Sequence, residues 1–578
     1  MPETAPSAAA VRPAERLRAW LPWLALAVLA LLLYFGGLGG MALLEPDEGR
    51  YAEIPREMLV RGDFVTPHLN GVLYFEKPPL YYWLNAAALA VLGDRETACR
   101  LAAALFGLAG AALAGLLGRS MGGPLRGNRI GLLSAVVLGT SPLWVALSRA
   151  NIIDMTLTFF LSATLTCFWL AQERDGGKGE RLLWYGVFVS AALATLAKGL
   201  IGFVIPGAVI FLYLLLTRRW RLLRRVPWVS GVALFLAVAV PWHVLAARRN
   251  PDFLWFYFVH EHFLRYATAE AKRQQPFWFF AAIVPLGLLP WSGLLPAASV
   301  MFRGVRLRDQ PHRTFLACWA GFVFLFFSAS QSKLVPYVLP ALPPLAVLIA
   351  LALSAADSGD LRIRARVRAG GVAGAVALAL LAAPLLWASF GRVPAVSAVF
   401  SPALFVFALP ALAACLLAAF WWRRDSGRPR SLALLAAAPA LIVGCLWVLG
   451  PRVALNLSAE PIARFLAPRL APGDEVYAYH CYPQTLPVYL RRLVGVVGYE
   501  GEMAFGIGHL PPEERGRRFP TAEQFRPLWS SGKTVYLVLE RKNLSRLERE
   551  GLAAGMILMG QEKYLLMTNH PPAPRSGD

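Results

Sequence analysis

The segment from residue 40 to residue 97 is dense in side chains that could do chemistry. Its central stretch reads EPDEGRYAEIPREMLVRGDFVTPHLNGVLYFEKPPLYYW (45–83) and is rich in Asp, Glu, Arg, Lys, His and Tyr. Carboxylates can act as bases or bind a metal ion, and basic side chains can hold an anionic substrate. An ordinary solvated loop with surface charges is the alternative interpretation.

Matching groups occur at the ends of later apolar segments. They are Asp154, Lys198 and the strings FVHEHFLRY (258–266) and SQSKLVPY (330–337). Ionisable groups beside long apolar segments are costly to desolvate unless they pair with each other or bind something charged. We therefore expect these groups to share one site with the 40–97 segment, and we expect that site to take an anionic substrate.

The composition indicates which elements position these groups. Of 578 residues, 57% are hydrophobic and 16% are charged, and the mean hydropathy is +0.51. The apolar residues come in blocks of about twenty, the length at which a helix crosses the hydrocarbon core of a bilayer. This pattern excludes a water-soluble enzyme, a disordered protein and a single-span receptor. It predicts a polytopic α-helical membrane protein.

Thirteen transmembrane helices are predicted from these blocks. They cover residues 20–39, 98–117, 130–147, 152–171, 183–197, 200–217, 228–247, 277–298, 314–330, 334–354, 369–390, 401–421 and 431–450. With this count, the Arg-rich connections all fall on one side, which the charge bias of membrane proteins makes cytoplasmic. The net charge of +22 is distributed over these short connections, so no nucleic-acid partner is expected.

Two regions fall on the opposite, external side. In the loop 40–97, the stretches 48–60 and 81–92 predict helices that lie in the membrane interface. In the tail 451–578, strand-like runs at 475–479, 493–499 and 534–540 alternate with helical stretches. This alternation predicts a small soluble α/β domain.

The loop from Glu45 to Trp83 closely resembles the signature of the polyprenyl-phosphate-sugar-dependent membrane glycosyltransferases of the GT-C fold, which include the protein O-mannosyltransferases. The acidic pair Asp47-Glu48 directly after the first span is the family hallmark, and EHFLRY (261–266) and SxSKxxxY (330–337) support the match. Within the family, the string D-E-x-R-Y-A-E-I-x-R-E-M, followed by PHLNGVLYFEKPPLYYW, looks most like the lipid A 4-amino-4-deoxy-L-arabinose transferases.

The resemblance implies a GT-C type transmembrane glycosyltransferase domain at 1–450, with its external catalytic loop at about 40–97, and a periplasmic α/β domain at 451–578. It implies an inverting pentosyltransferase of the bacterial inner (cytoplasmic) membrane with a periplasmic active site. The donor would be an undecaprenyl-phosphate-linked sugar and the acceptor a lipid A phosphate. The product would confer resistance to cationic antimicrobial peptides.

Asp47 is expected to be the central catalytic carboxylate, with Asp154 second. A hydroxyl acceptor would need a base, which a positioned Asp supplies. A lipid A phosphate needs none, because a phosphomonoester loses its second proton near pH 6. Asp47 would then orient the acceptor, bind the sugar amine or stabilise developing positive charge.

The departing donor phosphate calls for cationic groups, because negative charge grows on it during the reaction. The candidates are Lys77, Arg265 and Lys333, with Tyr337 as a neutral donor. Arg50 could hold the phosphate of either substrate. For each cation, an ion pair with a neighbouring carboxylate or a lipid headgroup is the alternative.

Glu76 and His262 could bind a divalent metal ion, with zinc as the first expectation. They lie on different loops, so their spacing in the sequence gives no support. His260 is equally suitable by composition, and His262 is preferred because it lies within the family-like E-H-x-x-R string. A histidine hydrogen-bonded at the interface is the alternative, and no nucleotide cofactor is expected.

Two other functions stay open at this point. A second polyprenyl-phosphate-sugar transferase, similar to the protein O-mannosyltransferases, would move another sugar to a protein or a different glycolipid. A lipid transporter or flippase would also fit the composition. Transporters usually carry polar residues midway along broken helices and often contain repeated halves, whereas the spans here are nearly free of acidic residues and show no evident repeat.

Overall fold

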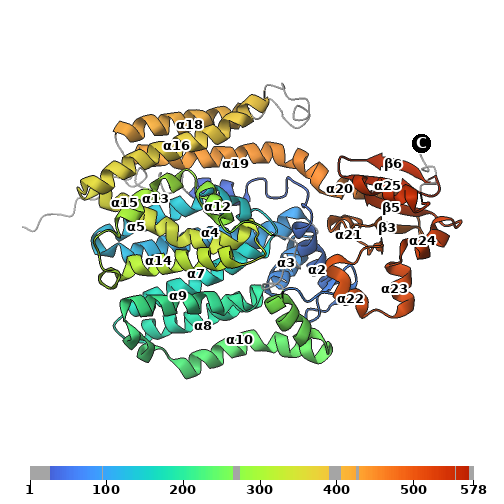
Figure 1. Ribbon diagram of the computed structural model, residues 1–578, viewed down its shortest axis with the longest axis horizontal. Helices are drawn as coiled ribbons and strands as arrows, with labels where there is room; N and C mark the ends of the chain where they lie inside the picture. Colours follow the sequence, from blue (N-terminus) through green and yellow to red (C-terminus); the bar gives the residue numbers. More distant parts are fainter. Residues whose placement is uncertain are drawn as a thin grey trace, which may run out of the picture.

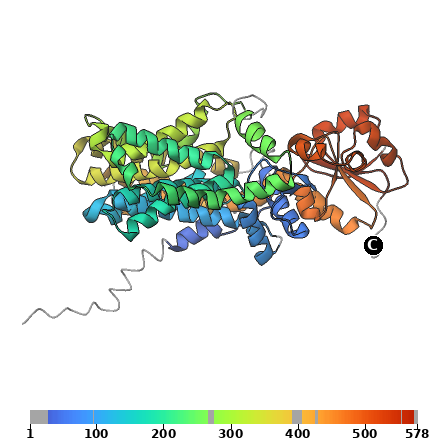
Figure 2. The same ribbon diagram turned by 90° about the horizontal axis from the view of Figure 1, so that it is seen from below.

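The computed structural model describes residues 27–93, 95–264, 274–389, 405–424, 429–552 and 555–571. A bundle of long helices fills one end of the molecule, and a smaller domain with a five-stranded sheet fills the other (Figure 1). The segment with α2 (Asp47–Arg61) and α3 (Leu80–Leu92) lies between them. The view from below shows the same order along the long axis (Figure 2).

Long apolar helices build the bundle. Among the described residues, seven are long and apolar enough to cross a membrane, with the 3-10 turn η5 (Val335–Ala341) counted together with α15. They are α4 (Glu96–Met121), α7 (Ile153–Gln172), α10 (Trp228–Arg249), α14 (Pro311–Ala329), α15 (Leu342–Asp357), α16 (Leu361–Ser389) and α18 (Phe405–Arg424).

Three bent pairs raise this number to ten in the described part of the chain. The pair α5 (Gly123–Gly139) and α6 (Pro142–Ser148) is bent by 67°, and α12 (Phe279–Gly287) is bent by 105° against η3 (Trp291–Leu294) and α13 (Leu295–Val300). The two parts of α19 (Pro429–Leu457) form an angle of 41°. At the first two bends, Pro142 and Pro290 each remove a backbone donor and interrupt the helix. A polytopic helical fold is therefore observed, while the count of thirteen spans stays a prediction.

The predicted division between the fifth and sixth spans is observed. The helices α8 (Lys178–Lys198) and α9 (Ile201–Thr217) are separate, and Gly199 stands between them at φ +86°. Residues other than glycine rarely adopt this backbone conformation. The chain therefore turns directly after Lys198, which places the lysine at the end of α8.

Among the described residues, two of the Arg-rich connections are tied to other helices at the end of the bundle away from the sheet domain. Arg225 lies 2.8 Å from Glu180, which joins the connection before α10 to the start of α8, and Arg129 of α5 pairs with Asp357 of α15. Arg225 also donates to a carbonyl at the end of α7. Because α7 begins next to Asp154 and has 20 residues, about 30 Å of helix separate this end from Asp154.

The two helices expected in the 40–97 loop are α2 and α3. α3 ends with exposed Val91 and Leu92, while α2 is enclosed on most sides and buries Glu48, Arg50 and Glu53. The position of α2 thus differs from the predicted helix with one face in the membrane interface. The reason is tertiary: α2 packs between α3 and α21 (Thr485–Leu490), and the C-terminal domain covers its polar face.

The C-terminal domain contains a mixed sheet in the order β4-β3-β5-β7-β6. The parallel part consists of β3 (Glu475–Tyr479), β4 (Gly495–Val497) and β5 (Val535–Glu540), and β7 (Tyr564–Thr568) runs antiparallel to both β5 and β6 (Met556–Gly560). Its helices include α23 (Pro512–Arg518), α24 (Ala522–Trp529) and α25 (Leu544–Arg549). Helix α19 continues through the boundary predicted at 450/451.

Candidate active site

A polar pocket lies where α2, α7, α8 and the segment before α15 meet. Seven charged side chains from distant parts of the sequence line it: Asp47, Arg50, Glu76, Lys77, Asp154, Lys198 and Glu261. Tyr51, Ser330, Ser332 and Tyr337 complete the polar lining. The structure thus brings together both predicted catalytic carboxylates and, from the predicted substrate-binding set, Arg50, Lys77 and Tyr337.

The acidic pair at the start of α2 divides into a buried and an accessible carboxylate. Glu48 is 4% exposed and accepts two hydrogen bonds of 2.7 Å from the Arg100 guanidinium of α4. It also accepts from the backbone N–H of Asn151, at 2.8 Å. The Asp47 side chain is 47% exposed and lines the pocket. Glu48 therefore fixes the start of α2, and Asp47 is the carboxylate that can meet a substrate.

Arg50 lies between two carboxylates. Its Nη2 is 3.1 Å from Oδ1 of Asp47, and its Nε is 3.0 Å from Oε2 of Glu502 in η8 (Gly501–Met503) of the C-terminal domain. Burial alone would lower the pKa of Arg50, but the negative charges of Glu502 and Asp47 outweigh it and raise that pKa well above its ordinary value. Arg50 is therefore a permanent cation at the edge of the pocket.

Asp154 and Lys198 form an ion pair inside the pocket. Asp154 is in the first turn of α7 and Lys198 is the last residue of α8, so the antiparallel packing of these helices brings them together. The Lys198 Nζ also lies 4.7 Å from the centroid of the Tyr337 ring. The sequence placed Lys198 among the matching groups without assigning it a role, and its signal was the Lys-Gly break between two apolar blocks.

Lys77 faces the pocket from the opposite wall. Its Nζ donates to the backbone carbonyl of Glu76 at 2.7 Å and lies 3.6 Å from Oε2 of Glu261. Lys77 follows the short hairpin of β1 (His68–Leu69) and β2 (Val72–Leu73), whereas Glu261 is on the π-helix η2 (Trp255–Leu264). The family-like string at 261–266 therefore supplies a carboxylate to the site.

Lys333 lies behind the pocket wall. It is 6% exposed, and its ammonium donates to the carbonyls of Ser330 at 2.6 Å and Gln275 at 3.0 Å. These bonds fasten the loop before η5 to the preceding segment. The predicted contact of Lys333 with a substrate phosphate stays a prediction, and so does that of Arg265, which lies outside the described residues.

The predicted metal ligands are only half described. Glu76 lines the pocket, but the side chain of His262 is outside the described part of the structure. Within the described ranges, no three His, Cys, Asp or Glu side chains are arranged to hold a metal ion. The described residues thus offer at most a partial ligand set.

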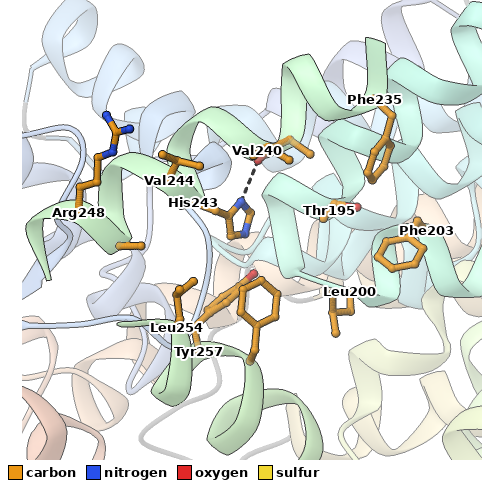
Figure 3. Close-up of a pocket in the computed structure, with 13 residues that line it drawn as sticks. Thr195, Leu200, Phe203, Phe235, Val240, His243, Val244, Arg248, Leu254 and Tyr257 are labelled. Atoms are coloured by element: carbon orange, nitrogen blue, oxygen red, sulfur yellow. Dashed lines mark hydrogen bonds between the residues drawn. The ribbon is translucent and has the colours of Figure 1, made fainter. Parts of the chain in front are cut away.

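An apolar cavity lies between α8, α9, α10 and η2 (Figure 3). Its lining includes Thr195, Leu200, Phe203, Phe235, His243 and Tyr257. Thr195 and Leu200 flank Lys198 in the sequence, and Tyr257 precedes Glu261 by four residues on η2. The two segments that present these charges to the pocket therefore also line the apolar cavity. One molecule with an anionic head and an apolar tail could contact both.

Two family models match the chain. The dolichyl-phosphate-mannose-protein mannosyltransferase model matches residues 20–258, which carry α2 and most of the pocket. The aminoarabinose transferase C-terminal domain model matches residues 462–568, which carry the sheet domain.

Full-length relatives agree with both models. The undecaprenyl phosphate-alpha-4-amino-4-deoxy-L-arabinose arabinosyl transferase of Erwinia tasmaniensis is 33% identical over 418 residues, which cover 70% of this chain and 74% of the relative. The chain belongs to this arabinosyl transferase family. The member from Edwardsiella ictaluri is 34% identical over 367 residues, so the chain spans 65% of the length of that relative.

Solved structures extend the similarity over nearly the whole chain. ArnT from Cupriavidus metallidurans bound to undecaprenyl phosphate is 29% identical with a TM-score of 0.81, covering 96% of this chain and 99% of that chain. Its apo state is 30% identical with a TM-score of 0.80 and covers 98% of that chain. These findings confirm the family that the first loop predicted and, with it, a membrane fold of the GT-C type.

Proposed function

We propose that this arabinosyl transferase moves 4-amino-4-deoxy-L-arabinose from undecaprenyl phosphate to a phosphate of lipid A at the periplasmic face of the inner membrane. The observation that carries the proposal is that the segments around Lys198 and Glu261 line both the charged pocket and the apolar cavity. A polyprenyl phosphate donor has a charged head and an apolar tail, and it would use both. The names of the relatives support the donor and the sugar, and the resemblance of the first loop supports lipid A as acceptor.

In the proposed reaction, an oxygen of the acceptor phosphate attacks the anomeric carbon. The bond from that carbon to the donor phosphate breaks, and its electron pair leaves with undecaprenyl phosphate. Cationic groups in a shielded pocket lower the barrier, because charge grows on the leaving phosphate. Lys77 and Lys198 supply these groups, each held in place by a carboxylate. Attack opposite to the leaving group inverts the anomeric centre.

Asp47 has a different task in this scheme. The acceptor phosphate is ionised near neutral pH and needs no base. Positive charge develops on the sugar ring as the donor bond breaks, and the sugar also carries an amine. The accessible Asp47 carboxylate would stabilise this positive charge and hold the amine, while Arg50 keeps the carboxylate in place.

The proposed orientation puts the pocket and the C-terminal domain in the periplasm, with thirteen spans in total. Its support is that Arg225, from the Arg-rich connection at 218–225, lies at the opposite end of α7 from Asp154, and such connections are usually cytoplasmic. An aminoarabinose added there offsets the negative charge of lipid A and weakens its attraction for polycations. Resistance to cationic antimicrobial peptides would follow.

A divalent ion, zinc first, stays part of the proposal, with Glu76 and His262 as its ligands. Glu76 supplies one oxygen ligand at the pocket wall, and no step above is assigned to the ion. Elemental analysis and transfer assays before and after chelation test it. Stoichiometric zinc that is lost together with activity would support the ion, and full activity of metal-free protein would contradict it.

The function is tested with purified protein in vesicles that contain the aminoarabinose donor and lipid A. Mass spectrometry is expected to find aminoarabinose on lipid A phosphate and to find none with the Asp47→Asn variant. Transfer to another acceptor, with none to lipid A, would contradict the acceptor. Donor movement across the bilayer without any transfer would contradict the enzyme and favour a flippase.

A further inference from the structure

Glu502 connects the C-terminal domain to the edge of the pocket. Its Oε2 is 3.0 Å from Nε of Arg50, and its side chain is 19% exposed. Its Oε1 accepts a hydrogen bond from the Gln484 amide of the same domain. Glu502 is thus held by its own domain while it holds a residue of α2.

The C-terminal domain is seated on α2 at the same place. Glu45 accepts from the backbone N–H groups of Gln484 at 2.7 Å and Thr485 at 2.9 Å. A Cβ atom on Gly49 would lie 2.6 Å from the backbone of both residues, so α2 touches the start of α21 backbone to backbone. The position of Glu502 relative to Arg50 is therefore set by close packing.

Arg50 meets two carboxylates through different edges of its guanidinium. Its Nε lies 3.0 Å from Glu502 and its Nη2 lies 3.1 Å from Asp47. A guanidinium with a single carboxylate partner tends to form two parallel hydrogen bonds to it. With Glu502 beside Nε, Arg50 approaches Asp47 through Nη2, and the Asp47 side chain is 47% exposed. Asp47 lines the pocket.

We propose that Glu502 is a positioning residue of the active site. It holds Arg50 by the Nε edge and so keeps the Asp47 carboxylate turned toward the pocket. Glu502 does not itself line that pocket, so it would act through Arg50. The C-terminal domain then completes the active site in addition to covering it. This inference rests on the proposed role of the pocket in sugar transfer.

The variant Glu502→Gln removes the charge and keeps the size of the side chain. Full-length protein in vesicles is expected to lose about tenfold in kcat, because a small displacement of an oriented group slows the chemical step. The KM for the lipid A acceptor should stay within about twofold. The matched control is Glu500→Gln on the same segment, whose carboxylate pairs with Arg515 at 3.2 Å and is half exposed. The control should keep wild-type kcat, and wild-type kcat in Glu502→Gln would overturn the proposal.

A double-mutant cycle separates positioning from general support of the fold. If Glu502 acts through Arg50, then Glu502→Gln costs nothing further in an Arg50→Gln background. Losses that multiply would overturn the proposal. The variant Arg50→Lys is a second test, because lysine keeps the positive charge but lacks the planar guanidinium that can contact two carboxylates at once. It should lose kcat to a similar extent, and wild-type kcat in this variant would also overturn the proposal.

Hydrogen–deuterium exchange tests the positioning without any transfer assay. The first turn of α2 should exchange faster in Glu502→Gln than in wild-type protein or Glu500→Gln. Unchanged exchange would overturn the positioning role. Wild-type protein that transfers no sugar would instead contradict the proposed function, and the exchange measurement would still decide whether Glu502 holds α2.

Discussion

Carboxylates and cations meet at both ends of the helical bundle, but their surroundings differ. At the end that carries the Arg-rich connections, Glu180 accepts hydrogen bonds from Arg225 at 2.9 Å, from Trp184 at 2.9 Å and from the backbone N–H of Gly176 at 2.7 Å. At the other end, the pairs of Asp47 with Arg50 and of Asp154 with Lys198 border an open pocket.

The difference separates charges that stabilise the fold from charges that can act on a substrate. A buried carboxylate that is fully hydrogen-bonded within the protein, as Glu180 is, holds parts of the fold together. Removal of its basic partner leaves the charge of that carboxylate buried and unpaired. Glu48 follows this first pattern with Arg100, although it is adjacent to Asp47, which follows the second. Membership of a charged motif is thus not enough to select a candidate catalytic group, and access to the pocket is the second criterion.

The largest effects on transfer and on stability are expected at the neighbouring residues Asp47 and Glu48, one of which lines the pocket while the other is buried in an ion pair. Asp47→Asn should reduce transfer at least about 100-fold, as loss of a charge-stabilising group does, and should leave the melting temperature unchanged. Glu48→Gln should lower stability by about 3–5 kcal/mol, because Arg100 keeps a buried charge without its partner. Transfer assays and thermal unfolding measure both. A fully active Asp47→Asn protein would contradict the comparison.

The next effect distinguishes the two ends of the bundle. Lys198→Ala should reduce kcat by roughly 10- to 100-fold, because it removes the cation that we propose stabilises the leaving phosphate. Arg225→Ala should keep kcat near the wild-type value. It should lower the melting temperature, because the ion pair between Arg225 and Glu180 is lost. Equal losses of kcat in the two variants would show that the ends are not functionally different.

A smaller effect is expected at the seat of the C-terminal domain. Gly49→Ala places a methyl group against the α21 backbone and should cost about 1–3 kcal/mol of stability, with lower transfer as α2 shifts. Gly516→Ala is the control, because a Cβ there meets nothing within 4 Å. Thermal unfolding of both proteins checks the prediction, and equal melting temperatures would contradict backbone contact at Gly49.

The smallest effect concerns pH. Burial, with the negative charge of Glu53, raises the pKa of Glu57 from 4.5 to about 7. Between these values the folded protein binds more protons than the unfolded chain, so stability should fall as pH rises through this window. Glu57→Gln should flatten that part of a plot of melting temperature against pH. An unchanged slope would contradict a protonated Glu57.

Local patterns predicted much of this molecule. Apolar blocks located the helices, because the length of a span is a local property of the sequence. The motif around Asp47 and Lys77 and the polar ends of apolar blocks at Asp154 located the pocket. The 105° bend after α12 was not predicted, because proline permits a break whose angle depends on tertiary packing.

Long-range contacts could not be obtained from the sequence. Glu502 is 452 positions from Arg50 in a segment without a chemical motif, and domain docking alone brings them together. Lys333 shows the opposite case: it is part of a family-like string, yet its ammonium is engaged by two backbone carbonyls. Residue type and spacing suggested that Lys333 contacts a substrate phosphate, whereas in the structure its ammonium is bonded to the backbone.

The most direct test of the account is a structure of this protein with bound undecaprenyl phosphate. We expect the phosphate to lie within hydrogen-bonding distance of Lys77 and Lys198, close to Asp47, and the first isoprene units to enter the apolar cavity beside Tyr257. A phosphate bound away from these three charged side chains, or a chain that leaves the apolar cavity empty, would contradict it.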